Sequence, residues 1–171
     1  IPEQEPQRQQ YFMAHAKEQL HILEENLGRP LTCCINTFGC QMNARDSEKL
    51  LGILETIGYQ AVETEDADFV LYNTCTVREK ANLRVYGRLG QLGARKKKHP
   101  HMMIALCGCM MQEKEVVEKI KKTYRFVDLI FGTHNIFKLA ELVSLCLEER
   151  LEELEAQGRE DKKPKHKMVV D

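Results

Sequence analysis

Three cysteines of this chain lie at nearly equal intervals and have the chemistry to bind one metal centre together. Cys40, Cys75 and Cys109 are separated by 35 and 34 residues, and each follows the end of a predicted strand. Thiolates are soft ligands that suit zinc and iron–sulfur clusters. The spacing alone leaves two interpretations open, which are a shared metal or cluster site and three unrelated loop residues.

Strand and helix patterns alternate between these cysteines. Runs of strand-forming residues cover residues 31–37, 69–73, 102–106 and 127–131, with a weaker run at 60–63. One helical pattern begins at Asp46 or Ser47, and three others cover residues 77–97, 112–122 and 135–150. Because parallel strands need long crossovers, this order predicts an α/β fold. We expect a three-layer, flavodoxin- or Rossmann-like parallel sheet of four to five strands with helices on both faces. Parallel strands end at one edge, so the three cysteines should converge there.

The other four of the seven cysteines are predicted to pack in the core. Cys33, Cys34 and Cys107 lie inside predicted strands, and Cys146 lies on the apolar stripe of the last helix. An odd number of cysteines in 171 residues argues against a disulfide framework and for an intracellular protein. With 25 basic and 26 acidic residues, the chain is not an obligately basic nucleic-acid module. Its apolar runs are far shorter than the roughly 18 residues that a membrane span needs.

The composition divides the chain into three parts. Residues 1–30 form a predicted helical leader with an apolar stripe, residues 31–147 form the α/β domain, and residues 148–171 form a charged linker. The apolar residues 168–170 resemble the first strand of a further unit. Gly87, Gly90 and Gly93 repeat within one predicted helix, which indicates that something approaches that face closely.

The sequence around the three cysteines resembles one known family. TFGCQMN (residues 37–43), NTCTVREKA (73–81) and CGCMMQ (107–112) are similar to the N-terminal domain of the radical-SAM methylthiotransferases. QMN after the first cysteine and TVREK after the second are typical of the MiaB-type, tRNA-modifying branch. GTHNI (132–136) is similar to the segment after the fourth strand of that domain. The resemblance covers residues 31–146.

This resemblance implies a cofactor and its ligands. Cys40, Cys75 and Cys109 would bind an auxiliary 4Fe-4S cluster, and three thiolates leave one iron open for a sulfur-bearing ligand. Apart from the resemblance, two interpretations fit the polar residues Gln41, Asn43, Asn73 and Thr76 equally well, which are hydrogen bonds around a cluster and local turn or N-cap bonding. The complete enzyme would add a radical-SAM barrel with a second 4Fe-4S cluster, S-adenosylmethionine and an RNA-binding TRAM domain. It would 2-methylthiolate N6-isopentenyladenosine beside the tRNA anticodon.

The barrel motif C-x3-C-x2-C is absent from these 171 residues, so we expect an N-terminal fragment that is inactive alone. We also expect a cytoplasmic monomer that meets tRNA through the full-length enzyme. The alternative is a zinc-binding or redox α/β module without its own catalysis. His134 follows its strand as the cysteines follow theirs, so a fourth ligand is one interpretation. We expect instead a surface residue before a helix, because the family pattern leaves one iron open. The basic run from Arg95 to His99 fits either tRNA phosphate contacts or a solvated helix end.

Overall fold

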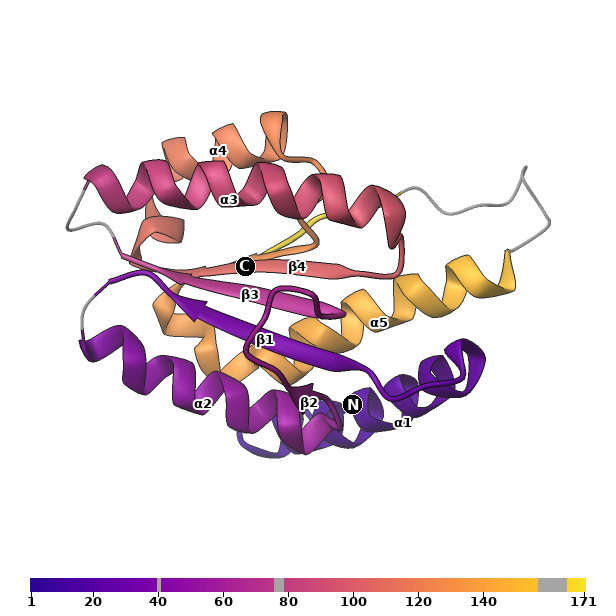
Figure 1. Cartoon of the computed structure of the whole chain (residues 1–171). Helices are drawn as coiled ribbons and strands as arrows, with labels where there is room; N and C mark the ends of the chain where they lie inside the picture. Colours follow the sequence, from indigo (N-terminus) through magenta and orange to yellow (C-terminus); the bar gives the residue numbers. More distant parts are fainter. Residues whose placement is uncertain (40, 76–78, 157–165) are drawn as a thin grey trace.

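A computed structural model describes residues 1–39, 41–75, 79–156 and 166–171 (Figure 1). Its described strands form one parallel sheet in the order β2-β1-β3-β4-β5-β6. The strands are β1 (Thr32–Thr37), β2 (Gln60–Ala61), β3 (Phe69–Thr74), β4 (Met103–Gly108), β5 (Leu129–Phe131) and β6 (Val169–Val170). The helices are α1 (Gln7–Leu27), α2 (Gln41–Ile57), α3 (Glu79–Lys98), α4 (Lys114–Thr123) and α5 (Leu139–Glu155). Two short 3-10 helices, η1 (Cys109–Gln112) and η2 (Thr133–Lys138), follow β4 and β5.

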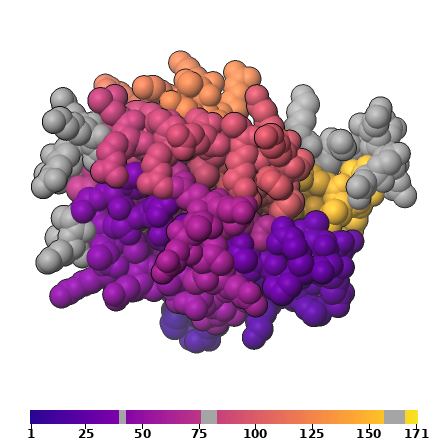
Figure 2. All heavy atoms as spheres, in the orientation of Figure 1, coloured from indigo at the N-terminus to yellow at the C-terminus, as the bar shows by residue number. Residues whose placement is uncertain are grey.

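The layers confirm the predicted α/β fold. α3 and α4 cover one face of the sheet, and α1, α2 and α5 cover the other (Figure 1). Successive side chains of a strand point to opposite faces. Val70 and Tyr72 of β3 therefore pack with α3, while Phe69 and Leu71 pack in the core below. Both faces of the central strands are buried, as is usual for a parallel sheet between helices. In Figure 2, α3 and α4 form the upper surface, and the purple first part of the chain lies below them.

The predicted leader is a helix that belongs to the core. The apolar stripe of α1 is buried, and Arg8 binds Glu141 of α5 at 2.9 Å. Gly28 closes the helix in the left-handed conformation, with φ of 75°. None of the helices in the described ranges is long and apolar enough to cross a membrane.

The C-terminal residues differ from the expectation of a strand in another unit. Val169–Val170 pair in parallel with β5, where the Val169 amide donates to the Asp128 carbonyl at 2.8 Å. They add one strand beyond the predicted four to five. α5 runs to Glu155, past the predicted boundary at residue 147. The division of the chain into leader, domain and linker stays a prediction.

The glycine repeat of α3 has a partner at one of its three positions. A Cβ atom on Gly93 would lie 2.5 Å from the Phe126 ring, so the ring occupies the space of the missing side chain. A Cβ on Gly87 or Gly90 would meet no heavy atom within 4 Å. The predicted close approach is therefore confirmed at Gly93. At Gly87 and Gly90, no described atom packs close to the helix face.

Candidate functional site

The strand order creates a switch point between β1 and β3. The chain moves from β1 outward to β2 and then returns to the other side of β1. In open α/β sheets, ligands bind at such a point, outside the carboxyl ends of the strands. Cys75 directly follows β3, and Cys109 directly follows β4 as the first residue of η1. Cys40, between β1 and α2, lies outside the described residues.

The β3–β4 register brings two of the predicted ligands to one level of the sheet. Thr74 lies opposite Gly108, so the chain leaves both strands at neighbouring positions, about 4.8 Å apart in a typical sheet. The Thr74 hydroxyl donates to the Cys107 carbonyl at 2.6 Å and closes this end of the strand pair. Cys75 is 6% exposed, and Cys109 is partly exposed. Cys75 and Cys109 therefore emerge side by side at the carboxyl edge.

Two glycines permit the close approach of the cysteine-bearing segments. Gly39 has φ of 150°, and a Cβ on it would lie 2.5 Å from the Cβ of Cys75. Gly108 has φ of 100°, and a Cβ on it would lie 2.6 Å from the Thr74 nitrogen. Gly39, which precedes Cys40, thus lies against Cys75. Gly108, which precedes Cys109, lies against Thr74, which precedes Cys75. Side chains at either glycine would force the segments apart.

A buried amide pair fixes the start of α2 against the end of β3. Asn43 donates from Nδ2 to the Thr74 carbonyl at 2.9 Å. Asn73 donates from Nδ2 to the Asn43 carbonyl at 2.8 Å and to the Ser47 hydroxyl at 3.1 Å. The hydroxyls of Thr37 and Ser47 lie 2.7 Å apart. These bonds join α2 to the ends of β1 and β3, the strands that border the switch point.

The same bonds explain why α2 begins earlier than predicted. The sequence placed its start at Asp46 or Ser47, but the helix begins at Gln41. The Ser47 hydroxyl contacts Asn73 and Thr37 from inside the helix and does not cap it. α2 therefore starts directly after Cys40.

Two of the four residues predicted to surround a cluster, Asn43 and Asn73, lie near Cys75. Asn43 binds the carbonyl of Thr74, the residue before Cys75, and Asn73 binds the carbonyl of Asn43. The structure does not describe the side chain of Gln41, and Thr76 lies outside the described residues. Four residues of the site were not predicted from the sequence: Gly39, Gly108, Thr37 and Ser47. A signal for the glycines was present, because a Gly directly precedes both Cys40 and Cys109.

The other four cysteines pack in the core, as predicted. Cys33, Cys34, Cys107 and Cys146 are buried within the two hydrophobic clusters that flank the sheet. Burial raises the pKa of the Cys33 thiol to about 12 and also raises the pKa values of the other three thiols. These thiols stay protonated near neutral pH, so they are poor metal ligands.

A metal centre at the carboxyl edge would draw on Cys75, Cys109 and the undescribed Cys40. Within the described ranges, no three His, Cys, Asp or Glu side chains gather closely enough to hold a metal ion. Those ranges contain two of the three predicted ligands. A set of three thiols fits an iron–sulfur cluster by its chemistry. His134 is exposed and lines a hollow of about 700 Å³ beside Asp46 and Lys49.

Comparisons with known proteins find similar sequences over most of this chain. A family model described as uncharacterized protein family UPF0004 matches residues 32–132. A tRNA-2-methylthio-N(6)-dimethylallyladenosine synthase from Lachnoclostridium phytofermentans is 71% identical over 131 residues, which cover 77% of this chain and 29% of the relative. Synthases of the same name from Acetivibrio thermocellus and Alkaliphilus oremlandii are 52% and 50% identical, covering 84% and 77% of this chain. The matched segments span 30% and 29% of those two relatives.

Proposed function

Because the chain belongs to the UPF0004 family, we propose that it is the N-terminal part of a tRNA methylthiotransferase. The observation that carries this proposal is the 71% identity to a synthase named for that reaction, over 131 residues. The family match over residues 32–132 includes all three motif cysteines. The substrate in the proposal is an N6-isopentenyladenosine beside the tRNA anticodon. The placement of Cys75 and Cys109 at the carboxyl edge supports a role in binding a cofactor there.

In this proposal Cys40, Cys75 and Cys109 hold an auxiliary 4Fe-4S cluster. Support comes from the soft sulfur donors and from the placement of Cys75 and Cys109 at the carboxyl edge, where the sheet has its switch point. Gly39 and Gly108, which permit close approach of the segments, add to it. When bound, the cluster would supply the sulfur for the 2-methylthio group. The Cys33, Cys34, Cys107 and Cys146 thiols take no part, because burial keeps them protonated.

The remaining residues of the site would position the ligands. Asn43 and Asn73 hold the first turn of α2 against β3, so they fix the segment that continues from Cys40 relative to Cys75. Gln41 and Thr76, next to Cys40 and Cys75 in the sequence, would complete the hydrogen-bonding groups around the cluster. The low exposure of Cys75 keeps water away from its sulfur.

The complete reaction would require more than this chain provides. A second 4Fe-4S cluster, S-adenosylmethionine, a radical-SAM domain and a TRAM domain would belong to the full-length enzyme. No C-x3-C-x2-C motif is present among the seven cysteines, so the 171-residue chain would not generate the radical. We place it in the cytoplasm as a monomeric unit of that enzyme.

Anaerobic reconstitution with iron and sulfide tests this function. The purified chain should take up about four irons and four sulfides, with the visible absorption of a 4Fe-4S centre. Cys75→Ala and Cys109→Ala should lower iron and sulfide uptake strongly. Cys34→Ala, which also removes one thiol, should leave uptake unchanged. Binding of zinc in place of iron, or full iron uptake after simultaneous replacement of Cys40, Cys75 and Cys109, would contradict the proposal.

A further inference from the structure

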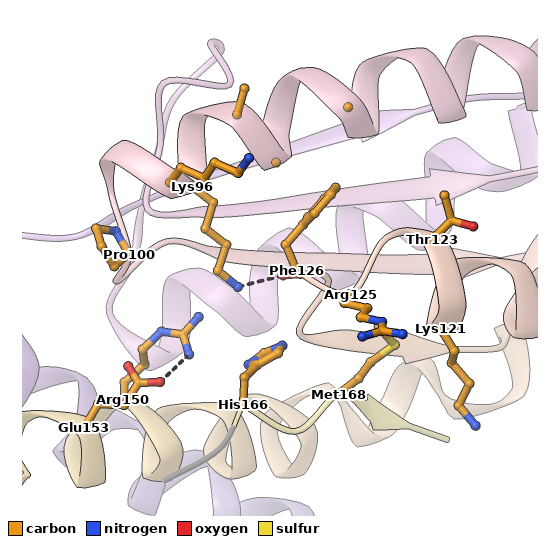
Figure 3. A pocket seen from close by; sticks show the side chains of 14 residues that line it. Lys96, Pro100, Lys121, Thr123, Arg125, Phe126, Arg150, Glu153, His166 and Met168 are labelled. Atoms are coloured by element: carbon orange, nitrogen blue, oxygen red, sulfur yellow. Dashed lines mark hydrogen bonds and ion pairs between the residues drawn. The ribbon is translucent and has the colours of Figure 1, made fainter. Parts of the chain in front are cut away.

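A hollow of about 1000 Å³ lies at the edge of the sheet opposite the cysteines (Figure 3). Its walls come from the second half of α3, from the end of α4 and the segment that follows it, from α5, and from the residues before β6. Three of these segments lead into the amino end of a strand: α3 precedes β4, α4 precedes β5, and residues 166–168 precede β6. Cys75 and Cys109, in contrast, follow the carboxyl ends of β3 and β4. Its titratable lining residues are Lys96, Lys97, Lys121, Arg125, Arg150 and His166, with Glu153 as the acidic one.

The cations at the base of the hollow already have partners. Lys96 contacts Asp128 at 2.8 Å and donates to the Phe126 carbonyl at 2.6 Å. Arg150, almost fully buried, contacts the same Asp128 at 2.8 Å and donates to a backbone carbonyl. His166 contacts Glu149 at 2.7 Å. The deep groups therefore offer no unpaired donor to orient a small ligand.

The cations at the rim are different. Lys97 on α3 and Arg125 after α4 are exposed, and neither has an ion pair within the described part of the chain. Lys121 has one weak partner, Glu118, at 3.9 Å, and both side chains are about half exposed. Exposed pairs of this kind are easily exchanged for another anion. Three cations from two separate segments, Lys97 on one side and Lys121 with Arg125 on the other, thus line one opening.

The structure also divides the basic run from Arg95 to His99 into two halves. Arg95 binds Asp66, and Lys96 lies in the base of the hollow with Asp128. Lys97 is exposed at the rim, and Lys98 is exposed beyond it. Only the second half is therefore free to contact a partner. Gly90, which also lines the hollow, borders open space, since a Cβ on it would meet no heavy atom within 4 Å.

We propose that the rim formed by Lys97, Lys121 and Arg125 binds the phosphate backbone of an RNA. Long exposed cations without a buried polar partner suit a chain of phosphates, which needs charge and not a shaped pocket. The choice of RNA among polyanions rests on the proposed function. The location of the site rests only on the exposed cations of the rim. The surface lies at the edge opposite the candidate cluster site, so contacts there would add affinity without touching the reacting base.

The test uses the whole 171-residue chain and a fluorescent anticodon stem–loop RNA, with anisotropy measured over a salt series. Lys97→Ala combined with Arg125→Ala removes two phosphate contacts, so the slope of log association constant against log salt should fall by about 1.4 to 1.8. The same two contacts correspond to about 25- to 60-fold in affinity near 0.1 M salt. The matched control combines Lys17→Ala with Lys49→Ala, which removes two exposed cations from α1 and α2 on the other face.

Unchanged affinity and slope in the Lys97/Arg125 variant would overturn the proposal, as would an equal loss in the control. Absence of RNA binding by the unaltered chain at low salt, or equal competition by polyglutamate of the same charge, would also overturn it. Iron uptake by the Lys97/Arg125 variant should equal that of the unaltered chain. The iron measurement keeps a failure of this surface distinct from a failure of the cluster assignment.

Discussion

Replacement of Gly108 by alanine should weaken both the fold and the cysteine site. Gly108 has φ of 100° and ψ of −175°, a conformation that is essentially restricted to glycine and costs other residues about 1–3 kcal/mol. The new Cβ would also lie 2.6 Å from the Thr74 nitrogen and 2.9 Å from Asn73 Oδ1. Both atoms are held, Thr74 by the β3–β4 pairing and Asn73 by its bonds to α2.

Relief of that overlap should add about 1–3 kcal/mol, as in other overpacked cores. The free energy of unfolding should therefore fall by about 2–6 kcal/mol, and for a chain of this size each kcal/mol lowers Tm by about 2–4 °C. Gly90→Ala is the matched control, because its Cβ would meet no heavy atom within 4 Å inside α3. That variant should gain about 1 kcal/mol from the better helix propensity of alanine.

Urea unfolding of the cluster-free chain measures both free energies, and iron per chain after reconstitution measures the site. Gly108→Ala should lose stability and bind less iron, because the overlap displaces the residue directly before Cys109. Gly90→Ala should keep its iron. A Gly108→Ala protein that unfolds within about 0.5 kcal/mol of the unaltered chain and takes up full iron would refute this reasoning.

Three further perturbations should affect stability. Asn73→Ala removes three hydrogen bonds to α2 and should lower the free energy of unfolding by about 1–3 kcal/mol in urea; no change would mean that the amide pair does not hold α2. Arg150→Ala leaves Asp128 without one of its buried cations and should cost about 3–5 kcal/mol, a prediction that a loss below about 1 kcal/mol would contradict. The hydrogen bond to Glu149 raises the pKa of His166 above its usual 6.5. The charged ring therefore stabilises the fold fully below about pH 6.5, and this contribution is lost as pH rises through the folded pKa. The stability difference between the unaltered chain and His166→Gln should therefore shrink as pH rises above about 6.5, and a constant difference would be the contrary result.

Local patterns were sufficient to predict most of the elements. The apolar run that became β3 and the stripe that became α3 depend on side-chain periodicity, which neighbouring residues determine. The convergence of Cys75 and Cys109 on one edge follows from the parallel sheet, which the strand and helix spacing predicts. The packing role of Cys146 followed from its place on an apolar helical stripe.

The remaining features depend on contacts between distant residues. The start of α2 was misplaced because Ser47 has the composition of a helix cap, yet its hydroxyl binds Asn73 in a neighbouring strand. The contact of Gly39 with Cys75 requires that β1 and β3 be neighbours, and no local signal gives that order. β6 is only two residues long, too short for a periodic pattern to reveal its partner.

The role of the three cysteines can be measured directly by locating iron in crystals of the anaerobically reconstituted chain, with diffraction data collected at the iron absorption edge. The anomalous density should form one group of about four irons at the carboxyl edge beside Gly39 and Gly108. Each of the sulfurs of Cys40, Cys75 and Cys109 should lie within bonding distance of its own iron. An iron peak elsewhere on the chain, with the Cys75 and Cys109 sulfurs clearly defined and bound to no metal, would contradict the central claim.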